Sequence, residues 1–228
     1  MAVTPRPAST VVLMDQMSRI YLTQRPKTMK FMGGQYVFPG GAVEKGDHKA
    51  DSQFINKDNS NELVNQGYYV AAARELFEEV GVLLCSSFDG TGVHFDKETE
   101  QKYRRQLLNG EISFLELLKN EGIIFHLESL TYIGNLTTPE ESPIRFDTRF
   151  FIAQLPKGQS PKPDLNEIDH AVWYTPEEAL LAYKSREISI APPTILALKT
   201  ILDHQNGNPL LMPDLAGMNL QDIRELRF

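Results

Sequence analysis

The sequence predicts a protein of the mixed α/β (α+β) class, in which helices cover a β-sheet, and three observations support this. Short apolar runs of strand character alternate with longer segments in which apolar residues recur at helical spacing. Of the 228 residues, 41% are hydrophobic and 23% are charged, a composition typical of a globular chain with its own core. No Pro/Gly/Ser-rich linker divides the chain, so we expect residues 1–228 to form a single domain.

The first part of the chain predicts strands followed by one helix. Residues 8–15 and 19–24 predict two strands around a short turn, and residues 36–38 predict a third that Pro39-Gly40-Gly41 ends. Residues 48–66 are polar, and we expect a surface insertion there. A helix should follow from about Tyr68 to Val80, because Gly81 is a residue type that commonly ends helices.

The second part predicts further strands and helices in alternation. Residues 96–121 predict a helix within a second insertion at residues 93–121, and strands are expected near residues 130–137, 146–155 and 168–174. Pro176 starts a helix that extends to about Lys184, and Pro192-Pro193 starts a last one with an apolar face. The tail at residues 207–228 carries no clear pattern.

Charge and composition argue against several classes of partner. The net charge is −7 and the isoelectric point about 5.3, so a nucleic-acid partner, which favours a basic face, is not expected. No apolar stretch approaches the ~18 residues of a membrane span, and we expect no membrane partner and no signal peptide. The single cysteine, Cys85, fits a reducing compartment and a cytoplasmic protein. A homodimer is left open.

The predicted helix near residues 68–80 carries three carboxylates on one face. Glu75, Glu78 and Glu79 stand at positions i, i+3 and i+4, while apolar side chains occupy the opposite face. Like charges at i,i+4 destabilise a helix by ~0.2–0.5 kcal/mol per pair, and a divalent cation with oxygen ligands would turn this repulsion into coordination. A solvated acidic face is the alternative interpretation, and this pattern alone does not separate the two.

Upstream of that helix, Gly40 and Gly41 stand in the segment Phe38-Pro39-Gly40-Gly41-Ala42-Val43-Glu44-Lys45-Gly46-Asp47. Two consecutive glycines permit a tight turn and a close approach of the backbone to a ligand. A backbone carbonyl of this turn could add a metal ligand, although an ordinary turn accounts for the Gly-Gly pair alone.

Together these two segments resemble the Nudix box of the MutT/Nudix hydrolases. Residues 74–82 match the family pattern at every fixed position, whereas Asp47 stands where the family usually has glutamate and residues 48–73 exceed the usual spacing. The resemblance implies a Nudix α/β/α sandwich with a mixed sheet, and Mg²⁺ (or Mn²⁺) as the cofactor. It further implies that Arg74 orients the glutamates by ion pairing, that Glu75 and Glu78 are catalytic, and that the metal ligands are Glu75, Glu78, Glu79 and the carbonyl of Gly41.

Residues 22–41 are similar to the upstream signature of the coenzyme A diphosphatase branch of that family. Coenzyme A carries a diphosphate and a 3′-phosphate, so Arg25, Lys27 and Lys30 are predicted to bind its phosphates, with a solvated basic loop as the alternative. Residues 145–151 and 191–194 look similar to the peroxisomal acyl-CoA diphosphatase-like subgroup, which also has an insertion in its box. That likeness implies substrate contact by Arg145 and Arg149. Alternate residues of a strand face opposite sides, so a surface ion pair of Arg149 is the alternative.

The family often takes a general base from a later loop. Glu140, Glu141 and Glu167 are candidates, and we favour Glu167, which precedes a predicted strand, over a merely solvated loop glutamate.

These features predict a Mg²⁺-dependent hydrolase that cleaves the diphosphate bond of a nucleotide-linked small molecule. The first hypothesis is coenzyme A or acyl-CoA, giving adenosine 3′,5′-bisphosphate and (acyl-)phosphopantetheine. The second keeps the enzyme but takes ADP-ribose, NADH or another nucleoside diphosphate derivative as substrate. The third is a non-catalytic Nudix-like ligand sensor, which the intact set of Glu75, Glu78 and Glu79 disfavours.

Overall fold

The strands form two sheets in the computed structural model, which describes residues 3–49, 51–56 and 64–213. The larger sheet has seven strands in the order β10-β2-β1-β9-β8, with β3 paired to β2 and β4 paired to β1. Strands β1 and β9 are parallel and the other pairs antiparallel, so the sheet is mixed. Its strands are β1 (Arg6–Met14), β2 (Ile20–Gln24), β3 (Tyr36–Val37), β4 (Gly40–Ala42), β8 (Thr131–Thr137), β9 (Phe146–Gln154) and β10 (His170–Tyr174).

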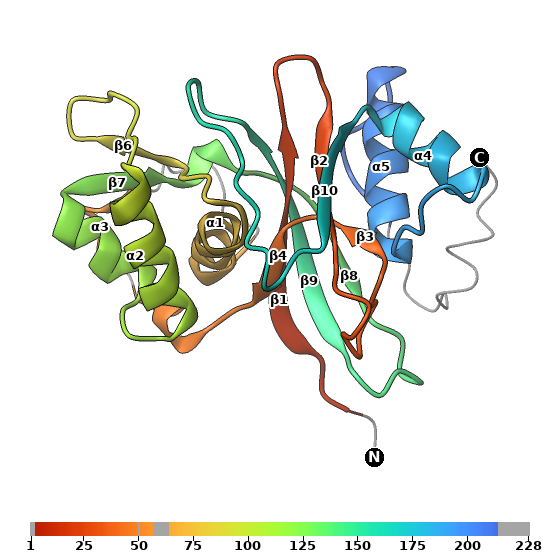
Figure 1. Ribbon diagram of the computed structural model, residues 1–228, viewed down its shortest axis with the longest axis horizontal. Coiled ribbons are helices and arrows are strands. Elements are labelled where there is room, and N and C mark those ends of the chain that lie inside the picture. The colour runs from red at the N-terminus through yellow and green to blue at the C-terminus, as the bar shows by residue number, and fades with distance from the viewer. Residues whose placement is uncertain (1–2, 50, 57–63, 214–228) are drawn as a thin grey trace.

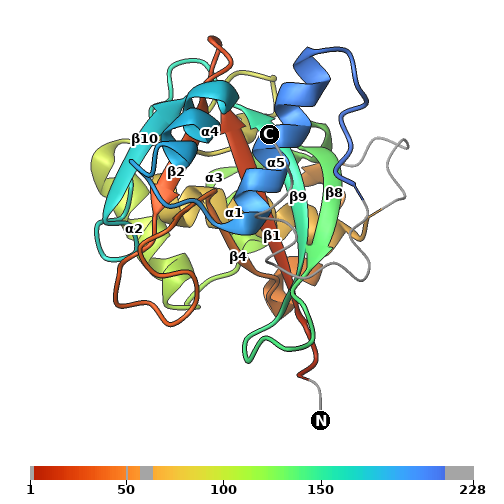
Figure 2. The same cartoon turned by 90° about the vertical axis from the view of Figure 1, so that its right-hand side faces the viewer.

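Helices cover both faces of the larger sheet. Helix α1 (Gln66–Val80) lies on one face, and α4 (Pro176–Lys184) and α5 (Pro192–Gln205) lie on the other (Figures 1 and 2). In β1, Val11 and Leu13 belong to the core cluster on the α1 side, whereas Val12 belongs to the cluster under α4 and α5. Successive side chains of a strand point to opposite faces, so this apolar run is buried on both sides. The predicted α/β/α sandwich is confirmed.

A second sheet and two further helices extend the α1 side of the molecule. This sheet has the order β5-β7-β6 and consists of β5 (Ile55–Asn56), β6 (Cys85–Ser87) and β7 (Ile123–His126). Helices α2 (Lys97–Leu108) and α3 (Phe114–Glu121) pack beside it. Two short 3₁₀ helices, Lys45–His48 and Leu127–Ser129, complete the elements of the described residues.

The helix that carries the three carboxylates begins slightly earlier than predicted and ends as predicted. Asn65 caps α1, its side chain accepting a hydrogen bond from the backbone N–H of Gly67 at 2.9 Å. Gly81 ends the helix in the left-handed conformation with φ of 70°. These two local signals fix the helix and therefore the register of its acidic face.

One prediction about local structure is wrong, and the structure adds detail to two others. Residues 96–121 form two helices instead of one, because Gly110 adopts φ of 65° after α2 and Ser113 forms a capping box that starts α3. Residues 48–66 are not only a surface insertion, since Ile55 is buried and pairs with Phe125 in the smaller sheet. The strand at residues 36–37 ends before Pro39-Gly40-Gly41 as predicted, and residues 40–42 then form β4. Strands β6 and β7 were not predicted because such short strands show little alternation.

Beyond α5 the chain forms no further helix or strand up to residue 213, and residues 214–228 of the predicted tail lie outside the described residues. None of the described helices combines the length and apolar character needed to cross a bilayer.

Candidate active site

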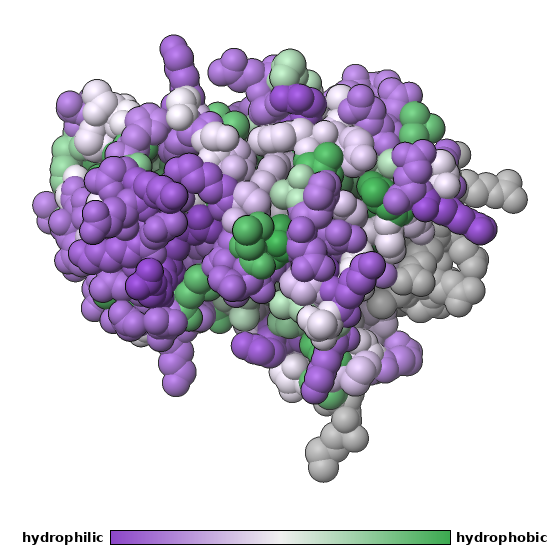
Figure 3. All heavy atoms as spheres, in the orientation of Figure 1, coloured by the Kyte–Doolittle hydropathy of each residue, from purple (hydrophilic) through white to green (hydrophobic). Residues whose placement is uncertain are grey.

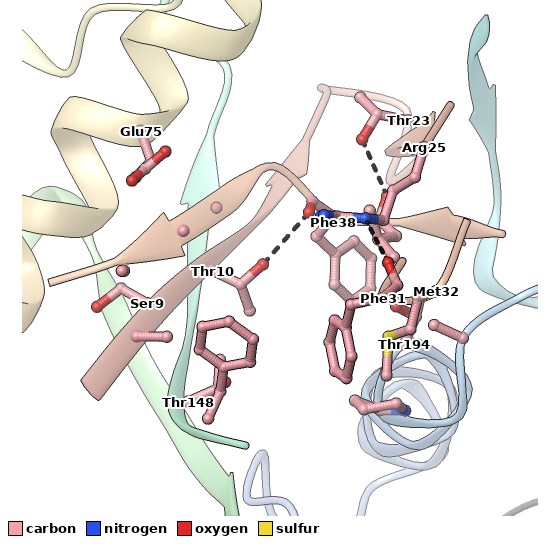
Figure 4. A pocket seen from close by; sticks show the side chains of 18 of the residues that line it. Ser9, Thr10, Thr23, Arg25, Phe31, Met32, Phe38, Glu75, Thr148 and Thr194 are labelled. Atoms are coloured by element: carbon pink, nitrogen blue, oxygen red, sulfur yellow. Dashed lines mark hydrogen bonds between the residues drawn. The ribbon is translucent and has the colours of Figure 1, made fainter. Parts of the chain in front are cut away.

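A cavity of about 350 Å³ opens between α1, the strands β1 and β4, and the start of α5. Its polar lining includes Ser9, Thr10, Glu75 and Glu79. The lining also includes the apolar side chains of Phe31, Met32, Phe38, Phe146 and Phe150. Figure 4 places Glu75, which projects from α1, across the cavity from Phe31 and Thr194. The cavity therefore combines carboxylates with apolar side chains.

The three carboxylates of α1 share one face of the helix but have different surroundings. Glu75 and Glu79 line the cavity, whereas Glu78 is 3% exposed and does not. The Nη1 atom of Arg74 donates to Oε2 of Glu78 at 2.8 Å and to Oε1 of Glu75 at 3.0 Å. Arg74 thus holds two of the three carboxylates in place.

Arg74 is itself held by Asp47, although residues 48–73 separate them in the sequence. Its Nε and Nη2 donate to the two carboxylate oxygens of Asp47 at 2.9 and 3.0 Å, and Nη2 also donates to the carbonyl of Ala42 at 2.9 Å. Asp47 is 1% exposed and accepts a hydrogen bond from the backbone N–H of Glu44. The two halves of the lengthened box therefore meet, and Asp47 contacts Arg74 instead of lining the cavity.

The two glycines of the upstream segment are required by close contacts with α1 and β1. The N–H of Gly40 donates to Oε2 of Glu79 at 3.2 Å, and a Cβ at Gly40 would lie 2.3 Å from the carbonyl oxygen of Ser9. A Cβ at Gly41 would lie 2.4 Å from Oε1 of Glu75. Any larger residue at position 41 would displace a carboxylate that faces the cavity.

Burial makes the ionised form of these carboxylates unfavourable. It raises the pKa of Glu75 to about 7 and that of Glu78 to about 8, although the charge of Arg74 opposes both shifts. Burial also raises the pKa of Glu79 well above its usual value, and the charges of Glu75 and Glu167 add to that shift. In the protein alone these carboxyls therefore keep their protons to higher pH than ordinary glutamates do.

The donor set of this cluster fits a divalent cation in its chemistry, since Mg²⁺ and Mn²⁺ prefer carboxylate and carbonyl oxygens. Within the described ranges, no three His, Cys, Asp or Glu side chains already form a metal-binding group, and Glu78 is bound to Arg74 instead. Glu75 and Glu79 are the carboxylates that face the cavity, beside the backbone of Gly41.

Two other predicted site residues also line the cavity. Glu167 does so from the loop between β9 and β10, and its pKa is raised by burial and by the charge of Asp164. Arg25 lines the same cavity, and its Nε donates to the carbonyl of Phe31 at 3.2 Å. Its charge lowers the pKa of both Glu79 and Glu167, which places a cation beside the carboxylates. The alternative bases Glu140 and Glu141 are exposed and do not line the cavity.

Three residues predicted to bind substrate are not brought to the cavity. Lys27 and Lys30 are exposed and are not part of its lining. Arg145 is buried, and its guanidinium donates to the carbonyls of Thr138 and Val3 at 3.0 and 2.8 Å. It thus holds the N-terminal segment against the connection between β8 and β9, and its bonded guanidinium gives no support to a substrate contact.

One cationic residue that lines the cavity was not identified from the sequence. Arg6 begins β1 and lines the cavity, and its side chain makes no hydrogen bond or ion pair with any residue that the structure describes. Its position follows from the parallel pairing of Arg6 with Phe146 on β9. A single arginine at the start of a strand gave no signal in the sequence, because the pairing joins segments that are far apart.

The sandwich, the glycine turn and the glutamate-bearing helix together define a protein of the Nudix class. The chain belongs to the family whose model is described as the NUDT19 Nudix domain, which matches residues 52–201. The resemblance inferred from the sequence is thereby confirmed, including its coenzyme A diphosphatase-like branch.

Relatives and a solved structure agree with this assignment. The chain is 29% identical over 224 residues to "Acyl-coenzyme A diphosphatase NUDT19" of Xenopus laevis, covering 80% of this chain and 59% of that protein. It is 28% identical over 193 residues to "Putative nudix hydrolase 7" of Caenorhabditis elegans, covering 84% and 58%. The chain thus spans about three fifths of the length of these relatives. A crystal structure of a Nudix hydrolase from Alicyclobacillus acidocaldarius aligns with a TM-score of 0.80 at 27% identity, covering 93% and 99%.

Proposed function

We propose that this chain is a Mg²⁺-dependent (or Mn²⁺-dependent) diphosphohydrolase that cleaves coenzyme A or acyl-CoA into adenosine 3′,5′-bisphosphate and (acyl-)phosphopantetheine. The observation that carries the proposal is one cavity lined by the partly buried carboxylates Glu75 and Glu79 and by the cations Arg25 and Arg6. Such a cavity suits a polyanion that binds together with a divalent cation. The names of the relatives support the substrate class.

In this proposal Glu75, Glu79 and the Gly41 carbonyl hold the cation, and Glu78 joins them when it leaves Arg74. When bound, the cation neutralises the diphosphate charge and lowers the pKa of the attacking water. Oxygen ligands from two turns of one helix suit this task, because the helix fixes their spacing.

The remaining side chains of the cavity act on the substrate and on the proton. Arg25 lies beside the carboxylates and binds a phosphate oxygen of the diphosphate. Glu167 faces the same space and accepts the proton of the attacking water; its raised pKa makes it a stronger base than an ordinary glutamate. The phenylalanines that line the cavity exclude water and accept the apolar parts of the substrate.

Product analysis after incubation of the purified chain with Mg²⁺ and coenzyme A tests the proposal. Release of adenosine 3′,5′-bisphosphate and 4′-phosphopantetheine is the expected result. Cleavage of ADP-ribose or NADH without cleavage of coenzyme A would keep the mechanism and replace the substrate. Absence of turnover on all of these compounds would favour the ligand sensor.

Stabilisation by Mg²⁺ is expected to increase with pH. The folded-state pKa values of about 7 for Glu75 and about 8 for Glu78 exceed the ordinary value of 4.5. Protonation of these carboxyls therefore stabilises the metal-free fold at low pH, and this contribution is lost as pH rises through 7 and 8. The Mg²⁺-induced rise in melting temperature should be small below pH 7 and largest above pH 8, as measured by calorimetry. A rise that is equal across this range would contradict the role of the carboxylates.

Replacing Arg6 by alanine is expected to raise KM for coenzyme A about tenfold, the effect of one charge-assisted hydrogen bond of about 1.5 kcal/mol. Its guanidinium has no partner among the described residues and lines the cavity, so it is available to the 3′-phosphate. With 3′-dephospho-coenzyme A, the same substitution should have little effect. Lys30→Ala is the control, because Lys30 is exposed and lies off the cavity. Equal losses on both substrates would contradict this contact.

We also propose that residues 1–228 form a single Nudix domain, which predicts one cooperative thermal transition. A homodimer and a cytoplasmic location stay predictions.

A further inference from the structure

The C-terminal end of α1 is bound by an arginine from outside the Nudix box. Arg104 lies on α2, and its Nε and Nη2 donate to the carbonyls of Glu78 and Glu79, each at 2.9 Å. The last carbonyls of a helix lack partners within the helix and form the negative end of its dipole. A buried guanidinium here supplies both the missing donors and a compensating charge; Arg104 is 9% exposed.

The same guanidinium also binds the loop that carries Glu167. This loop, residues 155–169, runs between α1 and β10 (Figure 1), and Nη1 of Arg104 donates to the carbonyl of Lys162 at 2.9 Å. The loop bonds directly to α1 as well, because the N–H groups of Lys162 and Asp164 donate to the carbonyls of Val80 and Glu79 at 2.7 and 2.8 Å. Arg104 therefore lies where the catalytic helix and the Glu167 loop meet.

Glu100, one turn earlier on α2, completes the contact. It forms ion pairs with both Arg104 and Lys162. A Cβ at Gly81 would lie 2.7 Å from Oε1 of Glu100, so the Glu100 carboxylate packs directly against the end of α1. The outward surface of α2 is strongly hydrophilic (Figure 3), and its residues that contact α1 and the loop are buried. The second insertion thus packs against α1 from the side, and none of its residues lines the cavity.

We propose that Arg104 is a positioning residue that fixes the last turn of α1 against the loop 155–169, and thereby sets the placement of Glu79 relative to Glu167. The backbone carbonyl of Glu79 accepts a hydrogen bond from Arg104, and the side chain of the same residue lines the cavity. Arg104 is therefore separated from the cavity by a single residue. The catalytic part of this inference rests on the proposed function; the structural part does not.

Arginine suits this position better than lysine. Its planar guanidinium has five N–H donors in a fixed arrangement, and here it reaches three carbonyls from two segments. A lysine would keep the charge but could not reach all three acceptors with the same geometry. Arg104→Lys should therefore rescue part of the function that Arg104→Ala loses.

The test compares Arg104→Ala and Arg104→Lys with the control Arg105→Ala, a neighbouring exposed residue of the same helix. Native-state hydrogen exchange of the amides of Lys162 and Asp164 is the first measurement, because those amides donate to α1. Steady-state kinetics with coenzyme A is the second. In Arg104→Ala we expect faster exchange confined to the loop and to the end of α1, and kcat lowered about tenfold or more with a smaller change in KM. Arg104→Lys should be intermediate.

Exchange and kcat at the level of Arg105→Ala would overturn the proposal, and so would faster exchange spread evenly over β1 and the loop. If Arg104→Ala does not fold, Glu100→Gln takes its place, since it removes the partner of both Arg104 and Lys162. Faster exchange at Lys162 is then expected, and unchanged exchange overturns the inference. A wild-type chain without turnover would refute the proposed function, while the exchange measurement would still test Arg104.

Discussion

Replacing Glu79 by glutamine is expected to lower kcat for coenzyme A about a thousandfold while the fold survives. Glutamine keeps the size of the side chain and can still accept the hydrogen bond that the N–H of Gly40 donates at 3.2 Å. It removes the charge, and with it one proposed ligand of the cation. Loss of about 4 kcal/mol of transition-state stabilisation corresponds to this rate, at about 1.4 kcal/mol per tenfold change.

The control for this substitution is Glu98→Gln, because Glu98 is exposed on the first turn of α2 and does not line the cavity. It should retain the full rate. The melting temperature gives a second readout, since removing a buried charge whose pKa is raised by burial should not destabilise the metal-free protein. A Glu79→Gln variant that keeps most of its activity would contradict the proposed site.

Replacing Gly41 by alanine is expected to lower kcat/KM about a hundredfold. The added Cβ would lie between 2.4 and 2.7 Å from the carboxylate atoms of Glu75, so this carboxylate must move away from its place in the cavity. A displacement of about 1 Å in a catalytic group commonly lowers the rate by this factor. Steady-state kinetics with coenzyme A and Mg²⁺ measures the change.

Gly92→Ala is the matched control, because a Cβ there meets only His94 at an ordinary contact distance of 3.9 Å. It should leave kcat/KM unchanged. The Gly41 variant should also bind Mg²⁺ more weakly, which titration calorimetry can measure without turnover. Equal activity of the two variants would show that the close approach of Gly41 to Glu75 has no catalytic importance.

Part of the candidate site could be predicted because it depends on local geometry. The spacing of Glu75, Glu78 and Glu79 places them on one face of any α-helix, and Asn65 and Gly81 bound that helix by contacts within a few residues. The glycine pair at positions 40 and 41 signalled a close approach of the backbone for the same reason: glycine has no side chain. The class of fold followed from the order of such local patterns.

Other features depended on contacts between distant segments. Arg74 meets Asp47 across residues 48–73, and Arg145, predicted to bind substrate, instead donates to the carbonyls of Val3 and Thr138. The spacing of residues along the chain predicted neither contact. For Arg145 the reason is that its acceptors are backbone carbonyls, which every residue type carries.

The sequence by itself determined the acidic face of α1 and the alternation of strands and helices that forms a sandwich, since both arise from helix and strand periodicity. It also determined the glycine turn, since glycine has no side chain. Only the tertiary structure placed two further arginines, whereas Arg25 was predicted from the sequence. Arg6 reaches the cavity through the parallel pairing of β1 with β9, and Arg104 reaches the end of α1 from a helix of the second insertion. The physical reason is that these contacts join residues far apart in the sequence, whereas helix and strand periodicity relates only residues that are close along the chain.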